Sequence, residues 1–105
     1  MRTELTELAG VHARWLSLRQ EAVAANVANA DRPNFQAMRA PDFAAVLDAS
    51  ARGAAIDPQR AILPSGNTVD LAQSMIEGGA VGREHNINAA VTSAFHRMTL
   101  LGLGQ

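Results

Sequence analysis

Apolar residues near the start of the chain recur at alternating steps of three and four. This N-terminal stripe consists of Leu8, Val11, Trp15, Leu18, Ala22 and Ala25. Alternating steps of three and four place side chains along one seam of an α-helix, as in a coiled coil. Because the residue before a proline is disfavoured in the helical region, the helix should end by Asp31 or Arg32, just before Pro33. The spacing predicts a helix over residues 4–31 that buries one face against a partner.

A second stripe with the same spacing lies near the other end. This C-terminal stripe consists of Ile87, Val91, Ala94, Met98 and Leu101. It predicts a helix over residues 68–102, with Asn67 or Thr68 as a candidate N-cap and Asp70 in the first turn.

Three glycines interrupt this second helical pattern. Gly78, Gly79 and Gly82 each lower helix stability by roughly 1 kcal/mol relative to alanine. Either the helix breaks at these residues, or a packed partner supplies the stability that the glycines remove.

Residues 32–66 form a looser connection with one short helix at about 41–52. Pro41 and Asp42 suit the start of that helix, and Gly53 suits its end. No run of alternating polarity predicts a strand. We therefore expect a single all-α domain over residues 1–105, in which the two long terminal helices pair as an antiparallel, coiled-coil-like hairpin. Residues 32–66, between the two long helices, need not be ordered in the monomer.

Charge and composition exclude several classes of function. The formal net charge of −1 gives no electrostatic reason to bind nucleic acid. No apolar run approaches the ~20 residues of a membrane span, and the first residues lack the apolar core of a cleaved secretory signal. The chain has no cysteine, which excludes a disulfide framework. We expect a protein that does not insert into membranes and is either cytoplasmic or exported by a route that reads no such signal.

Residues that could support catalysis or bind a metal are few. His85 and His96 would lie about 16 Å apart along one helix, too far to bind one ion. A metal site would need His12, Glu84 and His85 to converge. No nucleophile triad, paired acids or phosphate-binding loop is present, and the sequence predicts neither an enzyme nor a cofactor.

The end of the first predicted helix carries a recognisable motif. The segment AANVANADRPNFQA resembles the N-terminal signature of flagellar axial proteins, an Ala-Asn-x-x-Asn-x-x-Thr-Pro-Gly-Tyr/Phe pattern. The matching residues are Asn26, Asn29, Pro33 and Phe35. Arg32 replaces the usual threonine and Asn34 the usual glycine, but asparagine tolerates the positive φ that such a turn needs.

A second motif narrows the resemblance to one family. The segments APDF and SGNTVDLAQSM, together with the first motif, resemble the FlgB family of proximal rod proteins of the flagellar basal body. Its candidate assembly residues here are Gly66, Asn67, Val69, Asp70 and Leu71. The segment GGAVGREHNIN departs from the family, which usually has charged or polar helix formers there.

The resemblance implies a structural subunit for bacterial motility. Such a subunit is exported through the flagellar type III apparatus without a cleaved signal. It assembles through its terminal helices with copies of itself and with other rod and basal-body proteins. Asn26 and Asn29 would then lie where subunits interlock.

A free-standing helical interaction module or regulator remains the alternative. In that case the two stripes would form a self-contained hairpin that melts cooperatively and independently of concentration. The metal-enzyme alternative needs the convergence of histidines and Glu84 described above.

Overall fold

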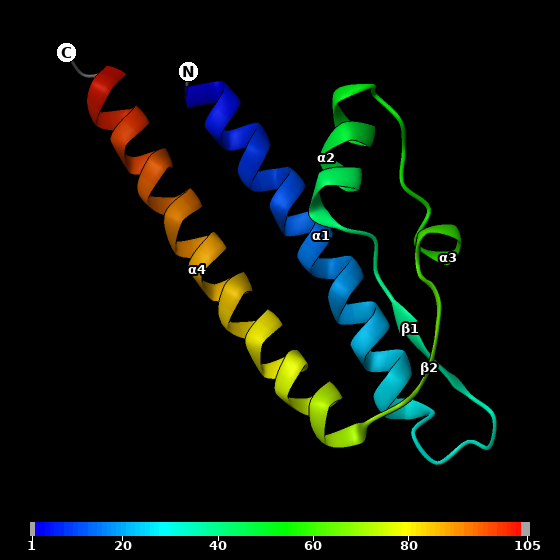
Figure 1. Ribbon diagram of the computed structural model, residues 1–105. Coiled ribbons are helices and arrows are strands. Elements are labelled where there is room, and N and C mark those ends of the chain that lie inside the picture. The colour runs from blue at the N-terminus through cyan, green and yellow to red at the C-terminus, as the bar shows by residue number, and fades with distance from the viewer. Residues whose placement is uncertain (1, 104–105) are drawn as a thin grey trace.

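The computed structural model describes residues 2–103 and shows two long helices that flank a short middle segment. The elements are α1 (Arg2–Ala28), β1 (Gln36–Arg39), α2 (Phe43–Ala51), α3 (Pro58–Ala61), β2 (Leu63–Thr68) and α4 (Leu71–Leu103). The molecule is elongated, with extents of 61 × 28 × 15 Å. Helices α1 and α4 run antiparallel, so both ends of the chain lie at one end of the hairpin (Figure 1).

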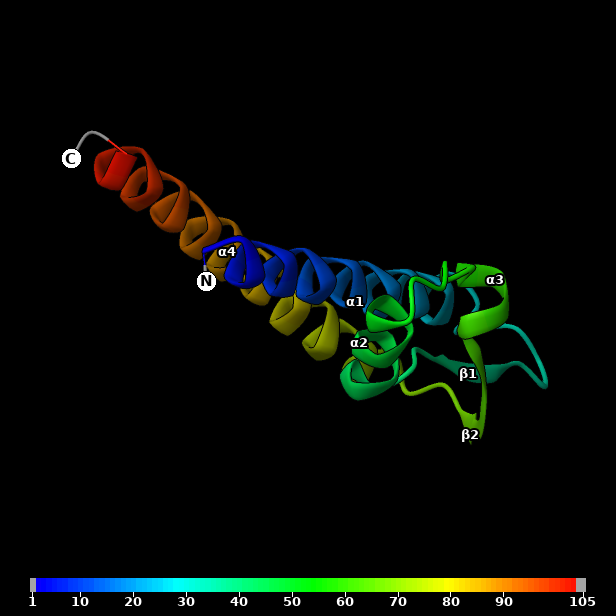
Figure 2. The same cartoon turned by 90° about the horizontal axis from the view of Figure 1, so that it is seen from above.

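Residues 36–68, called the middle segment below, lie on the side of α1 that faces away from α4 (Figure 1). Helix α1 is therefore the central layer. The C-terminal part of α4 extends beyond the start of α1 and away from the middle segment (Figure 2). This arrangement leaves the last turns of α4 largely open to solvent.

The prediction of two long terminal helices is confirmed, whereas the all-α class is wrong in one respect. Strands β1 and β2 form a two-stranded antiparallel sheet, with Met38 opposite Pro64 and an irregularity between Gln36 and Met38. Strand β2 has the sequence LPSGNT, which contains no alternation of polar and apolar residues. Periodicity could not reveal a strand that is almost entirely exposed.

Apart from Leu8, the N-terminal stripe faces the middle segment rather than α4. Val11 and Leu18 are buried in one cluster with Val46 of α2. A different face of α1 meets α4, where the side chain of Val23 lies near Gly78. Leu16, which is fully buried, shares this second face by helical spacing. Helix α1 thus has two apolar faces, one for each layer.

Helix α4 passes through its glycines without a break. A Cβ atom added at Gly78 would lie 3.2 Å from Cγ1 of Val23, which shows how closely the two helices approach. No atom lies within 4 Å of the corresponding position at Gly82. Close packing against α1 therefore accounts for Gly78, where a larger side chain would meet Val23.

Specific caps set the helix ends. The Asp70 carboxylate accepts a hydrogen bond from the backbone N–H of Gln73 at 3.1 Å, so Asp70 is the N-cap of α4. Asn67 and Thr68, the caps expected from the sequence, belong to β2 instead. Helix α2 ends at Ala51, and the chain turns at Gly53, whose φ is 72°. The N–H of Ala54 donates to the carbonyl of Ala49 at 2.9 Å. This is a Schellman motif, and it confirms Gly53 as the stop.

Candidate functional site

Asn26, the first asparagine of the motif, fastens β1 to α1. Its side-chain Nδ2 donates to the carbonyl of Met38 at 3.1 Å, and its Oδ1 accepts from the N–H of Met38 at 2.6 Å. The side chain thereby pairs with β1 much as a neighbouring strand would. Asn26 is buried, with 7% of its surface exposed. A buried amide with both ends satisfied fixes position strongly, because an unpaired one would be costly.

Proline on the other strand fits this arrangement. Both backbone polar groups of Met38 point toward Asn26, so they are turned away from Pro64, its partner in β2. Pro64 has no N–H to donate, and none is needed at a position where the pair exchanges no hydrogen bonds.

Asn29, the second asparagine, closes the end of α1. Its side-chain Nδ2 and its backbone N–H both donate to the carbonyl of Ala25, at 2.8 and 3.1 Å. The chain then turns through exposed Pro33 to half-buried Phe35. Asn34 has φ of 64° in this turn, which confirms that asparagine can adopt the conformation usually given to glycine.

Trp15 anchors the start of α2 to α1. Its indole N–H donates to the carbonyl of Pro41 at 2.9 Å. Its ring centroid lies 5.4 Å from that of Phe43 and 5.5 Å from that of His12. The guanidinium of Arg19 lies 4.8 Å from the Trp15 ring centroid and forms an ion pair with Glu84 at 2.9 Å. Arg19 therefore links the aromatic cluster to α4.

The second motif surrounds the start of α4. Gly66 has φ of 85°, a conformation that favours glycine. The backbone N–H of exposed Asn67 donates to Oγ of Ser65 at 3.2 Å. Val69 is half-buried, Asp70 caps the helix, and Leu71 is exposed. This motif thus shapes the passage from β2 into α4.

The C-terminal stripe is largely exposed in the single chain. The exposed fractions are 63% for Ile87, 42% for Val91, 61% for Met98 and 72% for Leu101, while Ala94 is half-buried. Leu8 of the N-terminal stripe is also exposed, and it meets two of these residues at a groove of about 440 Å³ between α1 and α4. The large apolar side chains of this groove are Leu5, Leu8, Ile87, Val91 and Phe95, together with Phe43 at α2.

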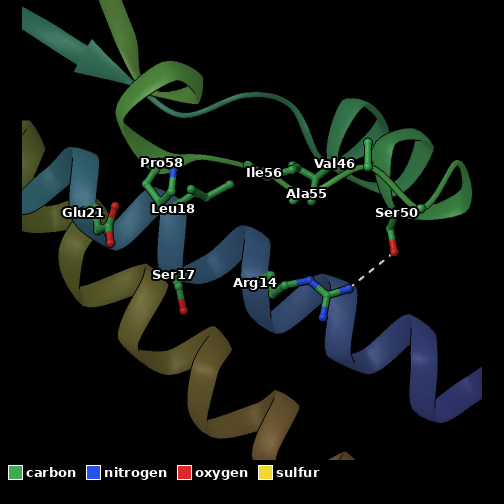
Figure 3. A pocket seen from close by; sticks show the side chains of 11 residues that line it. Arg14, Ser17, Leu18, Glu21, Val46, Ser50, Ala55, Ile56 and Pro58 are labelled. Atoms are coloured by element: carbon green, nitrogen blue, oxygen red, sulfur yellow. Dashed lines mark hydrogen bonds between the residues drawn. The ribbon is translucent and has the colours of Figure 1, made fainter.

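The rest of the N-terminal stripe lies under the middle segment. Val11, Leu18 and Ala22 are buried, and Trp15 and Ala25 are half-buried. Beside Leu18, α1, α2 and residues 53–58 line an open pocket of about 550 Å³, shown in Figure 3. Arg14 spans part of it and donates to Oγ of Ser50 at 3.3 Å.

The histidines do not converge on a metal site. Nδ1 of His12 lies 3.0 Å from Nδ2 of Asn88, and Glu84 is engaged with Arg19. Within residues 2–103, no group of three or more His, Cys, Asp or Glu side chains could hold an ion. The metal-enzyme alternative has no support in this geometry. Nor is any helix in this part of the chain long and apolar enough to cross a membrane.

Comparison with known proteins decides between the remaining readings. The chain is 34% identical to the flagellar basal body rod protein FlgB of Agrobacterium fabrum (strain C58), over an alignment 122 positions long. The match covers 93% of this chain and 91% of that protein. The chain belongs to the FlgB family. No protein-family model matches it. Membership confirms the family resemblance and makes the chain a structural subunit of the flagellar basal-body rod.

One interface of this FlgB-family chain escaped prediction from the sequence. The face of α4 that meets α1 includes Ser74 and Val81, which are buried, and Asn88, whose Nδ2 donates to the carbonyl of Ala9 at 3.1 Å. At the same spacing lie half-buried His85, Thr92, Phe95 and Thr99. Because most of these residues are small or polar, a search for apolar periodicity passes over them. The signal available in the sequence was the regular helical spacing of these small and polar residues, which places them on one face of α4.

Proposed function

We propose that this rod subunit assembles through its terminal helices, and that the C-terminal stripe and the adjoining groove form its principal contact surface. The observation that carries the proposal is the exposure of the stripe, above all of Met98 at 61% and Leu101 at 72%. Contiguous exposed apolar surface of this kind marks interaction sites in soluble proteins. Copies of the chain and other rod and basal-body proteins are the proposed partners.

The groove suits a helical neighbour. Its walls come from two parallel ridges, one carrying Leu5 and Leu8 on α1 and one carrying Ile87 and Val91 on α4. A third helix can place its own side-chain ridge between two such rows, as helices do in bundles. A neighbour there would cover apolar surface that the single chain leaves in water, which favours association.

The asparagines contribute to assembly indirectly in this proposal. Asn26 and Asn29 are both hydrogen-bonded within the chain, so they would act by fixing the end of α1 and the strand that follows it. Neighbouring subunits would then contact the surface formed by the end of α1 and β1, whose shape these two asparagines fix.

Export through the flagellar type III apparatus completes the proposal. It rests on the family resemblance and on the modest core of the subunit. The largest fully buried side chains are Leu16, Val46 and Val81. A chain with so small a core loses little stabilisation when it is unfolded for passage through a narrow channel.

A pair of substitutions at Met98 tests the proposed surface. Because Met98 is exposed, Met98→Glu should leave the isolated subunit folded, with unchanged circular dichroism at 222 nm. In cells that lack the native copy, we expect Met98→Glu to be absent from purified basal bodies and to abolish swimming. The control, Met98→Leu, keeps an apolar side chain of similar volume and should support both. Normal incorporation of Met98→Glu would contradict the proposal, because the rod would then assemble without an apolar C-terminal stripe.

A further inference from the structure

The N-terminal stripe has the spacing of a helix-helix seam, yet a segment of its own chain covers it. Val11 and Leu18 pack with Val46 of α2, and Val46 is only 1% exposed. Polar contacts from three residues of α1 hold the cover in place. The Trp15 indole donates to the Pro41 carbonyl, the Asn26 amide pairs with Met38, and Arg14 donates to Oγ of Ser50.

The cover is joined to the hairpin at one end only. Both of its connections to the hairpin, residues 29–35 and 69–70, lie at the end remote from the termini (Figure 1). Strands β1 and β2 tie those connections together. The middle segment can therefore swing about that end while α1 and α4 stay paired, at the cost of its contacts with α1.

We propose that the middle segment is an autoinhibitory cover, which occupies the N-terminal stripe in the free subunit and yields it to α4 of a second copy during assembly. The inference rests on the proposed function and adds a controlled step to it. The C-terminal stripe matches the vacated one, because both are apolar and both follow steps of three and four. A second copy is thus a suitable occupant. Opening adds this second contact to the exposed surface described above, so open subunits associate at a lower concentration than closed ones.

Asn26→Ala tests the latch, with Asn29→Ala as the matched control. Asn26→Ala removes both hydrogen bonds to Met38, and we expect the open population to rise about thirtyfold. Trp15 is the only tryptophan of the chain and reports opening through a red-shifted emission and stronger acrylamide quenching. Helix content should be unchanged. Sedimentation velocity should show association at a concentration at least about tenfold lower than for the native chain. Asn29→Ala, which removes only the side-chain bond to Ala25, should resemble the native chain in both measurements.

A reversible lock tests the same step without weakening the fold. The chain has no cysteine, and Arg14 of α1 reaches Oγ of Ser50 of α2 at 3.3 Å (Figure 3). A short bismaleimide with a cleavable disulfide, joining Arg14→Cys to Ser50→Cys in the Asn26→Ala background, should abolish the enhanced association. Cleavage by a reductant should restore it. The control joins Ser17→Cys to Glu21→Cys with the same reagent, within α1, and should have no effect.

The outcomes separate this inference from the proposed function. If the locked chain associates as well as the unlocked one, or if Trp15 becomes exposed without any gain in association, the cover is not inhibitory. If Trp15 becomes exposed only when the helix content also falls, the chain unfolds rather than opens, and the inference is overturned. In those cases the Met98 test can still succeed, because it does not require the cover to move. If instead Asn26→Ala associates equally well when combined with Met98→Glu, the C-terminal stripe is not the occupant, and that assignment falls.

Discussion

The close approach of α1 and α4 at Gly78 makes a quantitative prediction about the glycines. In an exposed helical position, Gly→Ala stabilises by roughly 1 kcal/mol. Gly82 is such a position, since no atom lies within 4 Å of its added Cβ. We expect Gly82→Ala to raise the free energy of unfolding by about 1 kcal/mol and the melting temperature by about 4–8 °C.

Gly78→Ala should not give this gain. Its new methyl group would lie 3.2 Å from Cγ1 of Val23, and a forced fit in a packed interface costs about 1–3 kcal/mol. Subtracting the propensity gain leaves a net loss of about 0–2 kcal/mol. The two alanine variants should therefore differ in stability by about 1–3 kcal/mol, although their chemistry is identical.

Urea denaturation followed by circular dichroism measures both variants, and a double-mutant cycle identifies the cause. In a Val23→Ala background the obstructing methyl groups are gone, so Gly78→Ala should become stabilising by about 1 kcal/mol. If Gly78→Ala stabilises the native chain as much as Gly82→Ala does, the helices do not approach closely at this point and the reasoning is refuted.

Substitutions at three further residues probe the α4 N-cap, the Trp15 anchor and the ion pair between Arg19 and Glu84. Asp70→Ala should lower the free energy of unfolding by about 1 kcal/mol by removing the α4 N-cap, and Asp70→Asn by much less; chemical denaturation of both checks this. Trp15→Phe keeps a ring but leaves the Pro41 carbonyl without its donor, so we expect a loss of about 1–3 kcal/mol and faster amide exchange in α2, measured by mass spectrometry. Glu84→Gln should lower the free energy of unfolding by less than about 1 kcal/mol, because the Glu84 side chain is 40% exposed. Added salt should reduce the difference in stability between this variant and the native chain. A larger loss that does not depend on salt would show that the ion pair with Arg19 is more important than its exposure implies.

The long helices could be predicted because their determinants are local. The N-terminal stripe and Pro33 fix α1 within a few residues, and Gly53 fixes the end of α2 through its left-handed conformation. Each of these signals depends only on residues adjacent in the sequence. The two-stranded sheet could not be predicted in this way, since one edge of β1 is held by the side chain of Asn26 from another element.

The residues that pack against each stripe could not be predicted from the sequence. Spacing shows that Val11 and Leu18 share a face, but any apolar surface could cover them, and the structure places Val46 there. The α4 face toward α1 is held partly by Gly78 and Asn88, residue types that carry no apolar signal. The family motifs were recognisable by residue type alone. That Asn26 and Asn29 form their hydrogen bonds inside the chain required coordinates.

The central claim is that this chain is built into the flagellar rod. Quantitative mass spectrometry of detergent-extracted basal bodies, purified from cells that express the chain naturally, tests it most directly. We predict that the chain is recovered in amounts comparable to those of other rod proteins. Its absence from intact, otherwise complete basal bodies would contradict the account.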